Sequence, residues 1–411
     1  MVENRQVDIS RKRKQNHLIV DTTTMPEKNI KGSIIISLQY FLYFGALGVY
    51  LPYFNLYLDE IGLSGFQIGA ISSVRMAATA FFPLFWAYLA DKFDIRKSIY
   101  ISCGFSSAAL FSLFLFIGSY YPLLILTFFY GLFYAPLISF LEAFSMDALG
   151  SSKQSYGKVR VWGSVSFIVF SFGVGYLINQ YSVFIAIPVI LVLSFLFVAA
   201  SSVLSGIRVK KVRVKKKAAH FMKNSRLMAF LLAAFLMLLS HGAYYGFFSI
   251  HLKNIGYGST FIGFLWALGT FSEISVMLFS KRIFEKYRIE NVLIFSLFIA
   301  CLRWLSLSYF TSPFPLVLSQ LSHAVTYGAF HIGSILYIDH MFPEGDKTLG
   351  QATNNAVSYG MGMMAGFFLS GYLIETMGAT MLFSLSGVAA LAGAFILLIA
   401  EKPRNYKKYV P

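Results

Sequence analysis

The chain has 411 residues, of which 57% are hydrophobic and only 13% charged, and its mean hydropathy is +0.66. Soluble globular proteins carry about 25% charged residues, so this composition excludes an ordinary soluble domain. A chain of 411 residues has room for about twelve membrane-spanning helices of roughly 20 residues each. It has only two cysteines, both in apolar segments, so we expect no disulfide framework, no metal and no cofactor.

Apolar segments recur along the whole chain and predict an all-α membrane protein with two six-helix halves. In the first half, 32–205, the predicted spans are 32–58, 66–90, 97–117, 122–147, 157–179 and 183–205. In the second half, 227–400, they are 227–252, 259–281, 291–310, 313–340, 348–375 and 379–400. The remaining parts are interpreted as a cytosolic tail (1–31), a basic linker (206–226) and a second tail (401–411). Either Met1 or Met25 fits as the native start.

The two halves resemble each other at a constant offset of 194 residues. Gly48–Phe54 aligns without a gap on Gly242–Phe248, and the match continues from Ile61-Gly62 to Ile255-Gly256. Two homologous halves are a common construction of transporters, which bind the solute between the halves and rock them against each other. The repeat therefore predicts a transporter.

The net charge of +16 reflects membrane topology rather than nucleic-acid binding. All but four of the 34 Lys and Arg residues lie in the two tails, the linker and the loops on the same side; the exceptions are Arg75, Arg160, Arg303 and Lys253. Basic loops remain in the cytoplasm, so we expect both termini there. We also expect the basic linker to contact anionic lipid headgroups.

Ionisable side chains at bilayer depth are costly and are therefore functional candidates. Because a helix rises 1.5 Å per residue, residues equidistant from a hairpin turn lie at one level. This argument pairs Glu142 with Arg160. In the second half it predicts one layer near the midplane, made of Glu273, Arg303, His323 and His241. The alternative is a set of salt bridges that only fix helix packing, and for Arg75 the two interpretations are evenly balanced.

Most of the 43 Phe and 25 Tyr must face lipid or other helices. Flat side chains beside a cation and a carboxylate, however, suit an aromatic ring or the apolar face of a sugar. The residues that we predict to bind substrate are Glu142, Arg160, Phe167, Arg75, Tyr244 and Tyr245. Those that we predict to couple transport to protons are Glu273, Arg303, His323 and His241.

The loop after the second span, Asp91-Lys92-Phe93-Asp94-Ile95-Arg96-Lys97, resembles the loop signature of the major facilitator superfamily. Ala87 and Asp94 replace its usual glycines. The resemblance implies that Asp91, Lys92 and Arg96 act as a conformational gate, in which the aspartate pins the inner ends of helices in the outward-open state.

Three further segments, Tyr156–Val165, Gly242–Phe247 and Arg303-Trp304, look like the phenylpropionate permease family of proton symporters. The likeness covers nearly all of residues 32–400. It implies import of a small organic solute such as 3-phenylpropionate or another aromatic acid, driven by a proton gradient. We expect a monomer in the bacterial inner membrane.

The same segments are similar to the more distant lactose permeases. The positions of that family's sugar-binding and stacking residues are Glu142, Arg160 and Phe167. The positions of its coupling carboxylate, arginine and histidine are Glu273, Arg303 and His323. One turn after that histidine, Thr326 replaces a carboxylate that carries the proton there. Either Glu273 carries the proton here, or coupling works differently, and a proton-coupled sugar or nucleoside symporter is the alternative.

Other classes of membrane protein are less well supported by the sequence. The chain has no His-Glu-x-x-His or Gly-x-Ser-x-Gly pattern of a membrane-embedded enzyme and no Gly-x-x-x-x-Gly-Lys-Ser/Thr pattern of a nucleotide-driven pump. The fifth span lacks the Gly-Pro-Gly-Gly type of motif usual in exporters of the superfamily. We therefore expect an importer rather than an enzyme.

Overall fold

The structure, a computed structural model, describes residues 27–149, 156–204, 224–343 and 345–401. Over these ranges the chain forms helices and short connections without any strand. Ten of the helices are long and apolar enough to cross a membrane. Most of the predicted tails and linker lies outside the described residues.

Six crossings make up the first half. Its helices are α2 (Glu27–Glu60), α3 (Gly65–Phe93), α4 (Arg96–Ser112), α5 (Tyr120–Tyr134), α6 (Pro136–Leu149), α7 (Tyr156–Gln180) and α8 (Ala186–Ser202). The fourth crossing consists of α5 and α6, which separate at Ala135. Pro136 causes this break because it has no N–H to continue the helical hydrogen bonds.

The second half also makes six crossings. Its helices are α9 (Ser225–Asn254), α10 (Ser259–Lys286), α11 (Ile289–Tyr309), α12 (Pro313–Leu321), α13 (Phe330–Met341), α14 (Lys347–Asn355) and α15 (Met363–Ala400). Two π-helical segments, η5 (Ala324–Ala329) and η6 (Ala356–Gly362), join α12 to α13 and α14 to α15.

Lys347–Ala400 contains two crossings rather than one. At 54 residues it would be about 80 Å long as one helix, against a hydrocarbon core of about 30 Å. It turns back at Gly378, whose φ of +77° lies in the left-handed region that favours glycine. Counted this way the described chain crosses the membrane twelve times, which confirms the predicted fold class. Observed and predicted helix ends agree to within about five residues.

The offset of 194 residues reappears in the three-dimensional structure. α3 begins at Gly65 and α10 begins 194 residues later, at Ser259. The turns that precede these helices contain Gly62 and Gly256, whose φ angles are +86° and +94°. Equivalent glycines thus make the same left-handed turn in both halves.

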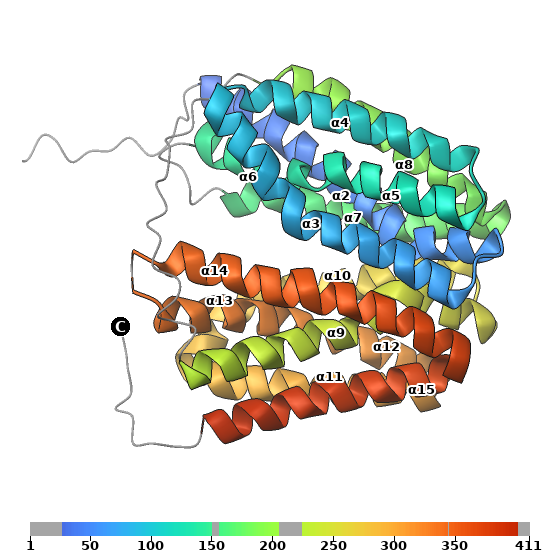
Figure 1. Cartoon of the computed structure of the whole chain (residues 1–411), viewed down its shortest axis with the longest axis vertical. Helices are drawn as coiled ribbons and strands as arrows, with labels where there is room; N and C mark the ends of the chain where they lie inside the picture. Colours follow the sequence, from blue (N-terminus) through green and yellow to red (C-terminus); the bar gives the residue numbers. More distant parts are fainter. Residues whose placement is uncertain (1–26, 150–155, 205–223, 344, 402–411) are drawn as a thin grey trace, which may run out of the picture.

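The two halves lie against each other as two layers of helices, the first above the second in Figure 1. α7 packs along α10, and α3 packs along α15. Glycines allow the backbones to touch at both contacts. A Cβ atom on Gly69 would meet the Gly371 backbone, and one on Gly263 would meet the Ser171 carbonyl oxygen.

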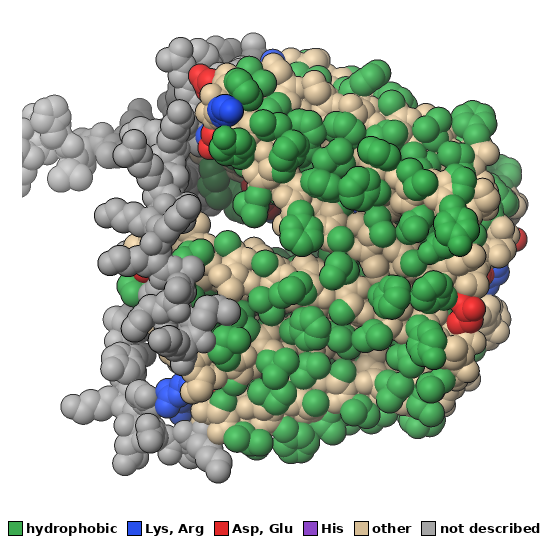
Figure 2. All heavy atoms as spheres, viewed as in Figure 1, with side chains coloured by type: hydrophobic (Ala, Val, Ile, Leu, Met, Phe, Trp, Pro, Cys, Tyr) green, Lys and Arg blue, Asp and Glu red, His purple; other side chains and the backbone are tan. Residues whose placement is uncertain are grey.

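The molecule has a terminal face, where α2 begins and α15 ends, and an opposite face, where the turns at Gly62, Gly256 and Gly378 lie. A hollow separates the halves toward the terminal face, whereas their surfaces meet toward the opposite face (Figure 2). Near the opposite face Asn55 Nδ2 donates to the Gly246 carbonyl oxygen across 2.9 Å. The structure is therefore open toward the terminal face and closed at the opposite face.

Candidate functional site

A cavity of about 250 Å³ lies between the two halves, and faces of five crossings form its walls. The lining residues are Phe44, Leu47 and Leu51 of α2, Arg160, Ser164 and Phe167 of α7, Tyr244 and Tyr245 of α9, Trp266, Thr270, Glu273 and Met277 of α10, and His323, Tyr327 and His331 of the α12–α13 crossing. Most of these residues are three or four positions apart within their helix, so each wall is one helix face.

Arg160 supplies the positive charge of the first-half wall. Its Cζ atom lies 3.9 Å from the centre of the Phe44 ring and 5.4 Å from that of Tyr40. Gly163 leaves room for this arrangement, since a Cβ atom there would lie 2.9 Å from Arg160 Nη1. Among the described residues no carboxylate oxygen lies within 4 Å of the guanidinium. Its charge is therefore available to a ligand.

Two predicted substrate-binding residues lie outside the cavity lining. Glu142 on α6 is exposed and forms no ion pair with Arg160, although the two were predicted at one level. Arg75 on α3 is buried, with its Cζ atom 4.8 Å from the centre of the Tyr50 ring and its Nη2 atom 3.7 Å from the sulfur of Met76. The other four predicted substrate-binding residues line the cavity.

The predicted layer of the second half is a chain of contacts with His323 at its centre. His323 Nε2 lies 2.8 Å from Glu273 Oε1, and His323 Nδ1 lies 2.6 Å from Arg303 Nη1. The same Arg303 nitrogen donates to Thr326 Oγ1 across 3.1 Å. Glu273 and Arg303 were predicted at one level, and in the structure the imidazole of His323 lies between them.

These contacts select one form of His323. Arginine can only donate a hydrogen bond, so Nδ1 must accept and carries no proton. Nε2 then carries the proton of the neutral ring, and this N–H donates a hydrogen bond to the Glu273 carboxylate. Arg303 thus fixes the tautomer through which His323 holds Glu273.

Arg303 and His241 form a second layer behind the cavity wall. The guanidinium of Arg303 lies between two rings, with its Cζ atom 4.5 Å from the centre of Tyr244 and 4.6 Å from that of Trp304. His241 is fully buried; its Nδ1 donates to the Met237 carbonyl oxygen across 2.8 Å. Both residues support the wall without lining the cavity.

The predicted gate residues lie on the terminal face, between α3 and α4. Arg96 donates from Nε and Nη2 to Asp91 Oδ1 across 2.9 Å and 2.6 Å, so this carboxylate is bound within its own loop. Lys92 lies over the Phe93 ring. Asp94, at a position where the superfamily signature has glycine, has a φ of +55°, a left-handed conformation that aspartate tolerates better than most residues.

Several cavity residues that were not predicted lie beside the predicted ones on the same helix faces. Trp266, Thr270 and Met277 share the α10 face of Glu273, and Tyr327 follows His323 by one turn. Spacings of three and four residues from a charged residue would have found them. His331 also lines the cavity and forms a 2.6 Å hydrogen bond through Nδ1 with the Tyr359 hydroxyl group.

A family model described as the MFS_1 like family matches residues 33–385. The chain belongs to this family. This family and the long apolar helices together make the protein a multi-pass membrane transporter of the major facilitator superfamily.

Several known proteins resemble this MFS_1-like chain. A probable 3-phenylpropionic acid transporter of Escherichia coli is 25% identical over 84% of this chain and 91% of its own length. The maltose permease of Geobacillus stearothermophilus is 25% identical over 90% of this chain and 94% of its own length. The crystal structure of the nucleoside transporter NupG matches with a TM-score of 0.81 at 19% identity, over 91% of this chain and all of that one, which shows a shared fold.

The contacts of His323 predict how two substitutions differ. His323→Gln keeps an acceptor for Arg303 and a donor for Glu273, so we expect a thermal unfolding midpoint within a few degrees of the parent. His323→Leu leaves both charged groups without this partner, which costs up to about 3 kcal/mol and should lower the midpoint by several degrees. Thermal unfolding of the detergent-purified variants measures this difference. Equal midpoints for the two variants would contradict the bridging role.

Proposed function

We propose that the protein is a proton symporter that imports an aromatic carboxylate of the size of 3-phenylpropionate. The observation that carries this proposal is that Arg160 and Glu273 line one cavity from different halves. Rocking of the halves changes the distance between Arg160 and Glu273, so binding of solute and proton can be linked to the same movement.

The cavity wall has the chemistry that an aromatic anion requires. Arg160 presents a guanidinium, which binds a carboxylate through two parallel hydrogen bonds. Rings from both halves, including Phe44, Tyr245 and Trp266, provide flat apolar surfaces for an aromatic ring. The relative in Escherichia coli named as a probable 3-phenylpropionic acid transporter supports the same class of solute.

Glu273 is the group that we propose to carry the proton. It is the one carboxylate among the described residues that line the cavity, and the position one turn after His323 holds neutral Thr326 instead of an acid. Burial favours the neutral form of a carboxylate, while a donor such as His323 favours the charged form. Loss of the His323 contact during rocking would let Glu273 take up a proton. When the contact with His323 forms again, Glu273 would release the proton.

We also propose that the terminal face is cytoplasmic, because the basic segments of the sequence continue from helix ends on this side. The structure then represents the inward-open state. A reporter fused after Pro411 tests the orientation, and an external signal would refute it.

The alternative solute is a neutral sugar or nucleoside. Relatives named as a maltose permease and a putative nucleoside transporter match over most of the chain. The flat rings of the cavity suit a sugar or a base, but a neutral solute has no charge to match Arg160. A comparison of 3-phenylpropionate, maltose and uridine with the purified protein distinguishes these solutes.

Substitutions at Arg160 and Phe44 test the anion site. Arg160→Gln removes a charge-assisted contact, and we expect it to weaken 3-phenylpropionate binding about 100-fold. Phe44→Leu removes the ring beneath the guanidinium and should weaken binding about three- to fivefold, while Phe44→Tyr keeps the ring and should bind like the parent. Isothermal titration of the detergent-purified proteins measures the three affinities. Unchanged affinity in Arg160→Gln would exclude this residue as the anion site.

Glu273→Gln tests the proton site. Glutamine still accepts a hydrogen bond from His323 but cannot exchange a proton. We therefore expect this variant in proteoliposomes to lose accumulation of 3-phenylpropionate driven by a pH gradient. It should retain exchange of external labelled for internal unlabelled solute, because exchange needs no net proton movement. Accumulation against a gradient by Glu273→Gln would place the proton site elsewhere.

A further inference from the structure

A cluster of charged residues joins the two halves at the opposite face. Lys253 Nζ, near the end of α9, lies 2.6 Å from Glu60 Oε2 and 3.5 Å from Asp59 Oδ2, both near the end of α2. Lys253 is also one of the four basic residues that lie outside the tails, the linker and the loops on their side. Lys253 does not line the cavity, and its charge instead pairs with carboxylates of the other half.

The place of this cluster follows from the sequence repeat. Asp59 and Lys253 are 194 residues apart, so they occupy the same position in their respective halves. Here the two equivalent side chains lie 3.5 Å apart, much as equivalent residues can face each other at the interface of a symmetric dimer. Two like charges would repel at such a point, whereas aspartate and lysine attract. The difference between the halves at this position makes their contact favourable.

A second polar contact links the halves on the same face. Glu375, near the end of the eleventh crossing, accepts hydrogen bonds from Ser64 Oγ and from the Phe66 backbone N–H, each across 2.7 Å. These donors lie at the start of α3, where backbone N–H groups have no partner within the helix and the helix dipole is positive. A carboxylate of the second half thus caps a helix of the first half.

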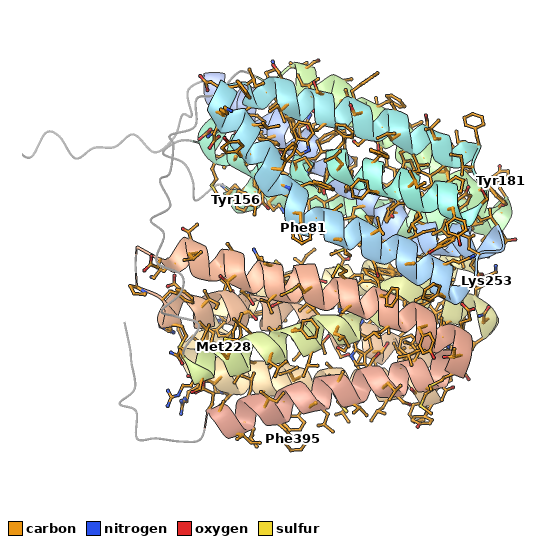
Figure 3. All side chains as sticks on the ribbon, viewed as in Figure 1. Phe81, Tyr156, Tyr181, Met228, Lys253 and Phe395 are labelled. Carbon is orange, nitrogen blue, oxygen red and sulfur yellow. The ribbon has the colours of Figure 1, made fainter. Side chains whose placement is uncertain are left out.

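Both contacts lie on the far side of the cavity from its opening. Lys253 is at the edge of the molecule where the two halves meet (Figure 3). For a solute to reach the cavity from this face, α2 and α3 must separate from α9 and α15. That movement removes the carboxylates from Lys253 and the helix start from Glu375.

We propose that Lys253, Asp59, Glu60 and Glu375 form a latch that keeps the opposite face closed and sets the balance between the two states of the transporter. The charged side chains of the Lys253 cluster are partly exposed, so their contribution to the ratio of closed to open molecules is about fivefold. A transporter must populate both states, so a factor of this size changes how long it waits in each. This role does not depend on which solute is carried.

The distance between the halves at the opposite face reports the state of the latch. Tyr181 directly follows α7 of the first half, and Phe314 lies in the first turn of α12 of the second half, both at this face. Their side chains are 76% and 77% exposed. Spin labels at Tyr181→Cys and Phe314→Cys, in a background with Cys103→Ser and Cys301→Ser, allow pulsed electron paramagnetic resonance on the purified protein without any solute. The short distance represents the closed face, and a longer one represents the open face.

Reversal of the lysine charge should open this face. In Lys253→Glu three carboxylates meet, and we expect the ratio of open to closed molecules to rise at least about fivefold. Lys253→Gln and Glu375→Gln should each raise it less. Exchange of the pair, Asp59→Lys with Lys253→Asp, should lower the ratio again relative to Lys253→Glu, because attraction between positions 59 and 253 is regained while Glu60 is unchanged.

Lys281→Glu is the matched control. Lys281 also pairs with a glutamate, Glu285, but within α10 and near the terminal face, so the same charge change there should leave the distances unchanged. The latch is refuted if Lys253→Glu keeps the parental distances, or if the exchanged pair is as open as Lys253→Glu. Should Lys253→Glu fail to fold, Lys253→Gln decides by the same criterion. Because no solute is present, these results are independent of the proposed aromatic acid.

Discussion

The contact chain from Glu273 through His323 to Arg303 is the interaction on which the site depends. Charges inside a membrane protein are tolerated only where they find partners or water. Arg303 obtains its partners from His323, Thr326 and the rings of Tyr244 and Trp304. Glu273 is held by the same imidazole but also reaches the cavity. One carboxylate is therefore both anchored and accessible, the combination that reversible protonation requires.

The sequence predicted the twelve crossings and the two halves because both depend on simple patterns. Apolar length determines where a helix crosses, and the 194-residue offset aligns the halves. Depth was predictable in the same way: counting from the hairpin turns put Glu273, Arg303, His323 and His241 in one layer, and the structure places the other three close to His323.

Depth is only one coordinate, however, and rotation about each helix axis remained unknown. Arg75 is turned toward Tyr50 rather than into the cavity, and Glu142 neither lines the cavity nor forms an ion pair with Arg160. In the tenth crossing the π-helical segment η5 follows His323. A π-helical turn contains more residues than an α-helical one, so it changes the direction of the side chains that follow, His331 among them. Lys253 was recognisable as exceptional, but its partners became visible only when the halves were assembled.

A structure with bound solute would show whether one cavity holds an aromatic anion on Arg160 opposite the proposed proton site at Glu273. Electron cryomicroscopy of the protein at saturating 3-phenylpropionate should show the carboxylate group against the Arg160 guanidinium and the ring between aromatic side chains of the two halves. An empty cavity, or a solute whose carboxylate lies away from Arg160, would contradict the account.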